Sequence, residues 1–135
     1  MTRILSIEAD RSLAQTVGRA CLEKGIAVGI AENLCEGIRF LLDGPVSAVL
    51  VDASLLRLPG VDQVKLFDAG TPGVPVVVLI GEKVSLPERV RYQILGFHPF
   101  SKSSPVEDLL EKAEALALAA SIGRERASQD WSILR

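Results

Sequence analysis

The chain has 135 residues, of which 48% are apolar and 24% are charged, and its formal net charge is −2. This length and composition are those of one globular domain that can bury a core without disulfides or structural metals. The charges are spread along the chain without a basic patch, which argues against nucleic acid and anionic membranes as partners. No apolar run approaches the length of a membrane span, and the N-terminal apolar stretch is too short for a signal peptide. We therefore expect a cytoplasmic protein.

Apolar strands alternate with amphipathic helices five times along the chain. The predicted strands cover residues 3–7, 26–30, 46–51, 74–80 and 97–101. Each strand is followed by a helical stripe of apolar residues. These helices are predicted to begin near Ser12, Asn33, Gly60, Ser85 and Ser104. Glycine and proline clusters such as DGP and AGTPG separate the elements.

The two central strands, at residues 46–51 and 74–80, are apolar on both faces. Strands of this kind belong in a parallel sheet with helices on both sides. The sequence therefore predicts a single doubly wound α/β domain over residues 1–120. Residues 121–135 turn polar and are expected to form a helix extension, a tail or a linker. The core is expected to include six strand residues: Ile4, Ile7, Val49, Val51, Val76 and Val78.

Charged residues follow the carboxyl ends of the predicted strands, where an open parallel sheet binds its ligands. Glu8 and Asp10 follow the first strand, Asp52 follows the third, and Lys102 follows the fifth. Three carboxylates and a lysine around one crevice suit a divalent cation such as Mg²⁺ and a phosphoryl group. The alternative is that these charges mark only the points where the chain returns to water.

The order and length of the elements resemble the receiver domain of two-component response regulators over residues 3–120. ILSIEAD resembles the family's first strand and its acids, and residues 22–52 follow the next elements down to the phospho-accepting aspartate. LPGVDQVKLF, PVVVLI and KSSPVEDLL resemble its third helix, its fourth strand, and its lysine loop with the last helix. The resemblance implies a flavodoxin-like parallel sheet of five strands in the order 2-1-3-4-5, with helices on both faces.

The resemblance also implies roles for individual residues. Asp52 would be the nucleophile that accepts phosphate from a histidine kinase, and Glu8 would be the first of two acids that organise the metal. Lys102 would pair with the phosphate. Phe100 would be the aromatic residue whose rotamer reports the activation state, and Ile80 stands at the family's second switch position.

Several departures from the family pattern predict an atypical, degenerate site. Ala9 replaces the second acid of the pair, so that Asp10 is the remaining candidate for a third metal ligand. Ile80 replaces a hydroxyl residue that would hydrogen-bond to the phosphoryl group. The loop ASLLRL after Asp52 is longer than usual, and Lys102 comes one residue early and is followed by serine rather than proline. These changes predict weak or absent Mg²⁺ binding and poor phosphorylation.

We hypothesise that the chain is a signalling module of a two-component (phosphorelay) system. It would act through a protein partner, either a histidine kinase or a downstream signalling protein, and would not be an enzyme beyond phosphorylation of its own Asp52. An ordinary Mg²⁺-dependent receiver that uses Glu8, Asp10 and Asp52 is the first alternative. The second alternative is a small-molecule-binding flavodoxin-like domain, for which EADRSLA offers only Ser12 to a phosphate group. No cofactor other than Mg²⁺ is expected.

Residues outside these motifs have simpler interpretations. Cys21 and Cys35 lie in helical patterns and are interpreted as buried, reduced thiols. His98 is the only histidine and is interpreted as a solvated loop residue.

A contact surface is expected around the fourth helix, the fifth strand and the fifth helix, where Arg89, Arg91 and Tyr92 lie. Trp131 either anchors a partner or a second copy of the chain, or packs back against the domain. The surface and this tryptophan together favour a weak homodimer.

Overall fold

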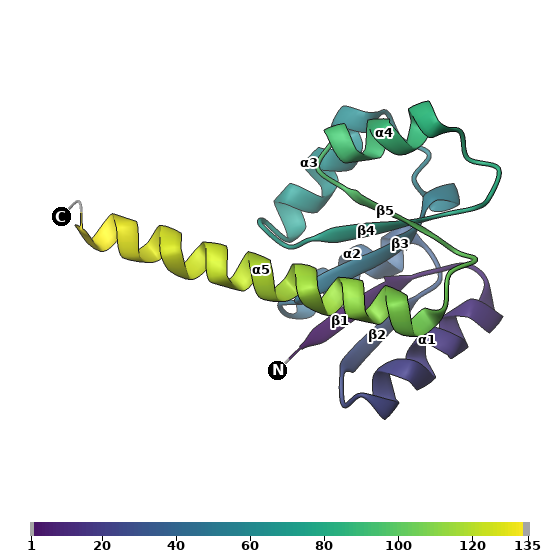
Figure 1. Cartoon of the computed structure of the whole chain (residues 1–135), viewed down its shortest axis with the longest axis horizontal. Helices are drawn as coiled ribbons and strands as arrows, with labels where there is room; N and C mark the ends of the chain where they lie inside the picture. The colour runs from purple at the N-terminus through teal and green to yellow at the C-terminus, as the bar shows by residue number, and fades with distance from the viewer. Residues whose placement is uncertain (1, 134–135) are drawn as a thin grey trace.

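The computed structural model describes the backbone of residues 2–133 and the side chains of residues 2–123. Strands and helices alternate throughout this part of the chain (Figure 1). The strands are β1 Arg3–Ile7, β2 Ala27–Ala31, β3 Ala48–Asp52, β4 Val76–Ile80 and β5 His98–Ser101. The helices are α1 Arg11–Glu23, α2 Leu34–Asp43, the short 3₁₀ helix η1 Ala53–Leu55, α3 Gly60–Gly70, α4 Leu86–Ile94 and α5 Val106–Ile133.

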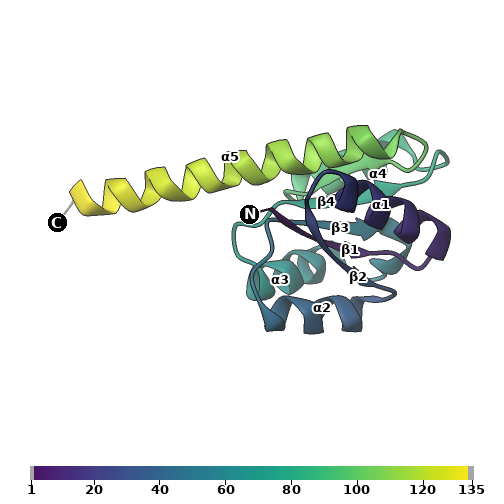
Figure 2. The same ribbon diagram turned by 90° about the horizontal axis from the view of Figure 1, so that it is seen from below.

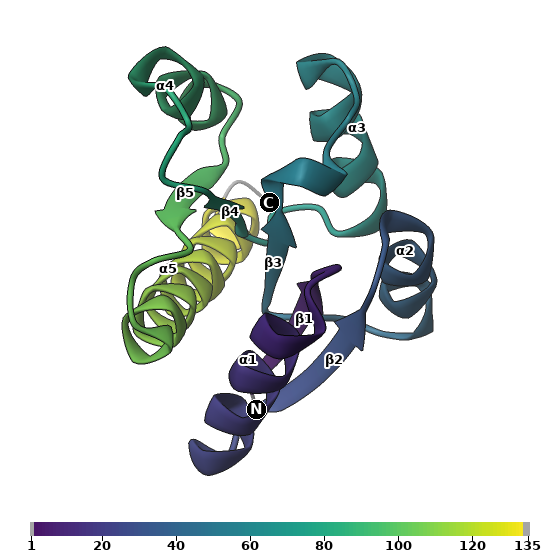
Figure 3. The same ribbon diagram turned by 90° about the vertical axis from the view of Figure 1, so that its right-hand side faces the viewer.

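The five strands form one parallel sheet in the order β2-β1-β3-β4-β5. α1 and α5 lie on one side of this sheet, and α2 and α3 lie on the other (Figures 2 and 3). α4 contributes to the same core cluster as α2 and α3 through its buried Tyr92. The predicted fold class, strand order and coverage of both faces are confirmed.

The core divides into two clusters because successive residues of each strand face opposite sides of the sheet. Leu5, Val49 and Val51 belong to the cluster under α2, α3 and α4. Ile4 and Leu50 belong to the cluster under α1 and α5. All six strand residues that were expected in the core are buried. Every residue of β3 and β4 is buried, which explains their nearly continuous apolar sequences.

The strand boundaries differ from the predicted ones by one or two residues. β4 begins at Val76 rather than at residue 74, directly after Pro75, which has no N–H to donate to a neighbouring strand. β3 ends at Asp52, one residue later than predicted. The acid is therefore the last residue of the strand, with its backbone fixed by β4 through the register pairing of Asp52 with Leu79.

The helix starts follow the capping signals, with one correction. Asn33 accepts a hydrogen bond from the backbone N–H of Glu36 at 2.9 Å, and the backbone N–H of Glu88 donates to the hydroxyl of Ser85. α1 begins at Arg11, and its N-cap is Asp10, which the sequence had suggested as a metal ligand. A carboxylate is a strong N-cap, so the helix begins earlier than the apolar stripe indicated.

Three single-residue predictions were wrong. Cys35 is exposed, whereas Cys21 is buried as expected. His98 lies in β5 and is half-buried; burial, with a smaller contribution from Lys112, lowers its pKa. Tyr92 is buried in the core and is therefore not part of a contact surface.

α5 is longer than the domain it covers. Among the described side chains of α5, Ala117 is the last one in the core. The helix continues to Ile133 and projects away from the sheet (Figures 1 and 2). Trp131 belongs to the part of α5 whose side chains lie outside those described. In the part of the chain that the structure describes, no helix is both long and apolar enough to span a membrane.

Candidate functional site

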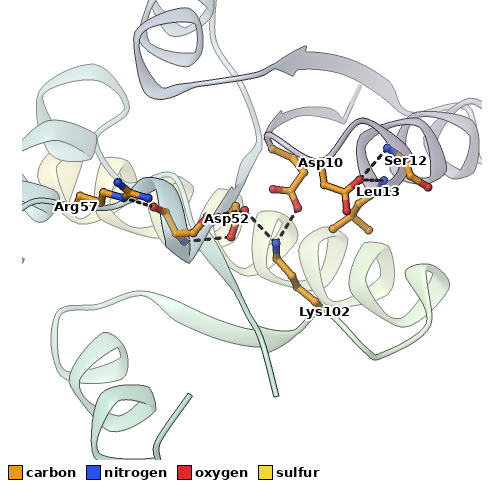
Figure 4. Close-up of polar contacts among 8 residues, drawn as sticks. Asp10, Ser12, Leu13, Asp52, Arg57 and Lys102 are labelled. Carbon is orange, nitrogen blue, oxygen red and sulfur yellow. Dashed lines mark hydrogen bonds and ion pairs between the residues drawn. The ribbon is translucent and has the colours of Figure 1, made fainter. Parts of the chain in front are cut away.

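Lys102 joins two carboxylates at the carboxyl end of the sheet. Its ammonium Nζ lies 3.0 Å from Oε1 of Glu8 and 3.0 Å from Oδ2 of Asp52 (Figure 4). Glu8 follows β1, Asp52 ends β3, and Lys102 follows β5, so the parallel sheet brings all three to the same edge. The backbone N–H of Lys102 donates to the carbonyl of Ile80 at 2.9 Å, which fixes the lysine beside β4. The structure therefore brings together three of the predicted site residues.

Because Glu8, Asp52 and Lys102 are largely buried, the charge of each side chain affects the pKa of the other two. The side chains of Glu8 and Asp52 are 1% and 8% exposed, and that of Lys102 is 30% exposed. Burial, followed by the neighbouring Asp52, raises the pKa of Glu8 to about 7. Burial alone would raise the pKa of Asp52, but its interactions with Glu8 and Lys102 and its hydrogen bonds from Ser54 lower it. Both carboxylates raise the pKa of Lys102 against the effect of burial. The lysine is thus a charged partner of an ionised Asp52.

Ser54 binds both oxygens of the Asp52 carboxylate. Its backbone N–H donates to Oδ1 at 3.1 Å, and its hydroxyl donates to Oδ2 at 2.9 Å. Oδ2 therefore receives the Ser54 hydroxyl as well as the Lys102 ammonium. Sequence reasoning did not identify Ser54. The available signal was a serine two residues after an aspartate, a spacing at which hydroxyl and carboxylate side chains bond to nearby backbone.

Gln63 organises the long loop that follows Asp52. This side chain is 1% exposed, and its Nε2 donates to the carbonyls of Leu56 and Leu58 at 3.0 and 2.9 Å. Leu56 itself is buried in the core. The additional residues of the loop therefore form an ordered turn, η1, and the loop does not carry Asp52 away from the sheet edge. Gln63 was not predicted from the sequence either, because no local sequence pattern distinguishes a buried glutamine on a helix from an exposed one.

Asp10 does not join the cluster. Its Oδ1 accepts the backbone N–H groups of Ser12 and Leu13 at 2.9 and 3.3 Å, and the side chain is used to cap α1 (Figure 4). The predicted third metal ligand is thus directed to the helix terminus. Ala9 has no ligand atom in its side chain to replace it.

Of the three carboxylates predicted to bind a divalent cation, two meet at this edge of the sheet. Mg²⁺ is held by several oxygen ligands, with carboxylates foremost. Within the described residues, no three His, Cys, Asp or Glu side chains are grouped so as to hold a metal ion. The two carboxylates that do meet, those of Glu8 and Asp52, are both paired with the Lys102 ammonium.

The two predicted switch residues lie on opposite faces of the sheet. Ile80 is 1% exposed and belongs to the core cluster with Tyr92 and Phe97. Phe100 packs against the other cluster, under α1 and α5. Strand alternation separates them, because Phe100 is paired in register with Leu79 rather than with Ile80.

An open hollow of about 370 Å³ lies beside Asp52. It is lined by Asp52, Ala53, Ser54, Leu79, Gly81, Val84, Glu88, Tyr92 and Lys102. A small anionic group can approach the carboxylate from this side, since Lys102 forms part of the same wall.

No family model matches the chain. The response regulator MprA of Mycobacterium sp. (strain KMS) is 26% identical over 115 residues, which cover 84% of this chain and 50% of that protein. The chain thus spans about half the length of the curated relatives it matches.

Two solved structures have a similar fold. A CheY-like response regulator receiver domain from Methanospirillum hungatei JF-1 has a TM-score of 0.77 at 22% identity, covering 91% of this chain and 98% of that one. A response regulator from Burkholderia pseudomallei, solved with a phosphorylated aspartic acid, a calcium ion and citrate, has a TM-score of 0.72 at 22% identity. The match covers 96% of this chain and 75% of that one. The chain therefore has the fold of CheY-like receiver domains, a five-stranded parallel sheet in the order 2-1-3-4-5 covered by helices.

Proposed function

We propose that this chain is a receiver module of two-component signalling that acts through contact with a protein partner and has an atypical phospho-acceptor site. The observation that carries the proposal is the Lys102 ammonium, which lies 3.0 Å from the carboxylates of both Glu8 and Asp52. The proposal is supported by the location of Asp52 at the end of β3, the strand that the resemblance assigns to the phospho-acceptor. Its partner is a histidine kinase or a downstream signalling protein, and its place of action is the cytoplasm.

The atypical character is supported by what surrounds Asp52. Phosphoryl transfer depends on positioning and on neutralisation of the transferred charge. Asp10 is used to cap α1, and Ile80 is buried where a hydroxyl would otherwise contact the phosphoryl group. Mg²⁺ binding is therefore weak or lost, and phosphorylation of Asp52 from a small phosphodonor is slow.

Acetyl phosphate labelling tests this proposal. The full chain is incubated with acetyl phosphate and Mg²⁺ under conditions that label ordinary receivers, and intact mass is measured. We expect most of the protein to remain unmodified. An Asp52→Asn variant is the control for the site of any adduct. A large phosphate adduct that vanishes in this variant would show a working receiver and refute the atypical site.

One observation favours an ordinary Mg²⁺-dependent receiver as the second candidate. Both carboxylate oxygens of Glu8 are buried, and neither has a hydrogen-bond partner among the described residues, although Oε1 is paired with Lys102. Buried carboxylate oxygens of this kind are available to a cation. A Mg²⁺ titration followed by the amide NMR signals of residues 52–54 separates the candidates. Saturable shifts at about millimolar Mg²⁺ would favour the ordinary receiver.

The contact surface for a protein partner is best placed on α4. Leu86, Val90 and Ile94 are spaced by four residues and are 73%, 41% and 79% exposed. They form one apolar stripe on the outer side of the helix. An exposed apolar patch marks an interaction site more often than a scattered apolar residue does.

A further inference from the structure

The environment of Asp52 contains an interaction that the receiver resemblance does not account for. Ser54 donates two hydrogen bonds to one carboxylate, from its N–H to Oδ1 at 3.1 Å and from its hydroxyl to Oδ2 at 2.9 Å. Lys102 donates to Oδ2 from the other side. Each oxygen of Asp52 therefore already has a protein donor.

The turn that presents Ser54 is held from both of its ends. The guanidinium Nε of Arg57 donates to the carbonyl of Ser54 at 3.2 Å (Figure 4). The backbone N–H of Leu56 donates to the carbonyl of Ala53 at 3.0 Å, and Leu56 is buried in the core. Gln63 holds the following carbonyls from α3. The turn that presents the hydroxyl to Asp52 is thus held by Arg57, Leu56 and Gln63 as well as by Asp52 itself.

We propose that Ser54 is a positioning residue that holds the Asp52 carboxylate in its paired arrangement and thereby slows its reaction with a phosphodonor. This proposal rests on the proposed function, in which Asp52 stands at a phospho-acceptor position. It adds a specific cause for slow phosphorylation that lies in the loop after β3, separate from the missing metal ligand and from Ile80.

Ser54 opposes the transfer of a phosphoryl group from acetyl phosphate to Asp52. Oδ2 of the ionised Asp52 attacks the phosphorus of acetyl phosphate, and a new oxygen–phosphorus bond forms. The bond between phosphorus and the acetyl oxygen breaks, and acetate leaves with the electron pair. No proton is consumed, because Asp52 is a carboxylate. Oδ2 shares its lone pairs with the Ser54 hydroxyl, and a hydrogen bond to an ionised acceptor is among the stronger ones in a protein. The attack requires this hydrogen bond to be given up.

The test compares the initial rate of Asp52 labelling by acetyl phosphate in full-length variants. Ser54→Ala removes the hydroxyl and keeps the backbone N–H, and we expect labelling about fivefold to tenfold faster than wild type. Ser54→Thr keeps a hydroxyl and should label at the wild-type rate. Ser103→Ala removes a hydroxyl from the loop beside Lys102 that is bonded to Ser101 rather than to Asp52. It is the matched control and should also follow wild type.

Each result decides the proposal. If Ser54→Ala is no faster than wild type, including the case in which neither is labelled, the proposal is overturned. It is also overturned if Ser54→Thr is as fast as Ser54→Ala, because the hydroxyl is then not responsible. Efficient labelling of the wild type would contradict the proposed atypical site, yet the ratio of the two rates would still decide the role of Ser54. Ser54 is exposed, so the alanine variant is expected to fold.

Discussion

Glu8 keeps its proton to a higher pH in the folded chain than in the unfolded chain. Burial, and then Asp52, raise the pKa of Glu8 from 4.5 to about 7. Between these two values the folded state binds more protons than the unfolded state does. The free energy of unfolding therefore falls as the pH rises through this window. The effect of Asp52 on the free energy of unfolding has the opposite sign. Because its pKa is lower in the folded chain, Asp52 stabilises the fold at neutral pH, and this contribution is lost as the pH falls into the acid range.

A Glu8→Gln variant should remove the loss of stability that the titration of Glu8 causes as the pH rises. Relative to this variant, we expect wild type to lose about 1 to 3 kcal/mol of unfolding free energy between about pH 5 and about pH 8. Urea denaturation at the two pH values measures the difference. Glu23→Gln changes an exposed glutamate of α1 and should show the wild-type pH dependence. The same pH dependence in wild type and in Glu8→Gln would contradict the assignment.

The site residues whose positions are set by the strands of the sheet were predictable from the sequence. Glu8, Asp52 and Lys102 follow or end strands, and a parallel sheet brings such positions together whatever the details of the loops. Ser54 was not predictable in the same way, because its hydrogen bonds depend on the conformation of η1. Asp10 could be read either as a ligand or as a helix cap, and only the position of the first turn of α1 decides between the two.

At the scale of single elements, α2 packs against β1 so closely that a side chain at Gly37 has no room. A Cβ atom at this position would lie 2.5 Å from Cδ1 and 2.9 Å from Cγ1 of Ile7, which is fully buried. The absence of a side chain at Gly37 therefore sets the distance between the helix and the sheet.

We expect Gly37→Ala to lower the free energy of unfolding by about 1 to 3 kcal/mol. The steric cost exceeds the gain in helix propensity, which is at most about 1 kcal/mol. Gly123→Ala is the matched control, because Gly123 is also helical and its Cβ would have no atom within 4 Å. This control should be neutral or slightly stabilising. Urea denaturation checks both variants, and a stability of Gly37→Ala equal to that of the control would refute the close packing.

The elements themselves were largely predictable from apolar periodicity and capping signals. β3 and β4 could be identified as central strands because all their residues are apolar except the terminal Asp52. The exact boundaries were less predictable, since they depend on which backbone groups pair across the sheet. β5 was weak in sequence because no residue of it is fully buried.

At the scale of the whole molecule, the α4 stripe is the surface through which we expect weak self-association. Two copies that pair through Leu86, Val90 and Ile94 would bury apolar area now in contact with water. We expect sedimentation of the full chain to show a monomer–dimer equilibrium at about 10 to 100 μM. A Leu86→Ser, Ile94→Ser double variant should be monomeric at the same concentrations.

Two similarly exposed leucines on two other helices serve as the control for this experiment. Leu22 and Leu42 are 73% and 78% exposed, on α1 and α2, and their replacement by serine should leave the equilibrium unchanged. A wild-type chain that stays monomeric throughout would end the homodimer hypothesis and leave α4 to a different partner. Repeating the measurement on a chain that ends at Ser121 separates any contribution of the projecting part of α5.

β1 lies between β2 and β3, and from this position we infer an order in which the sheet can be built during synthesis. β1 pairs with β2 and with β3, so a three-stranded unit is complete once residue 52 has been made. β4 and β5 can then join only one after the other, each at the free edge left by the strand before it. Glu8 and Asp52 meet in the early unit, whereas Lys102 arrives only behind β5. On this order we expect the two neighbouring acids to lack their counter-ion until β5 docks, so that the last strand both completes the sheet and supplies the charge that neutralises the site.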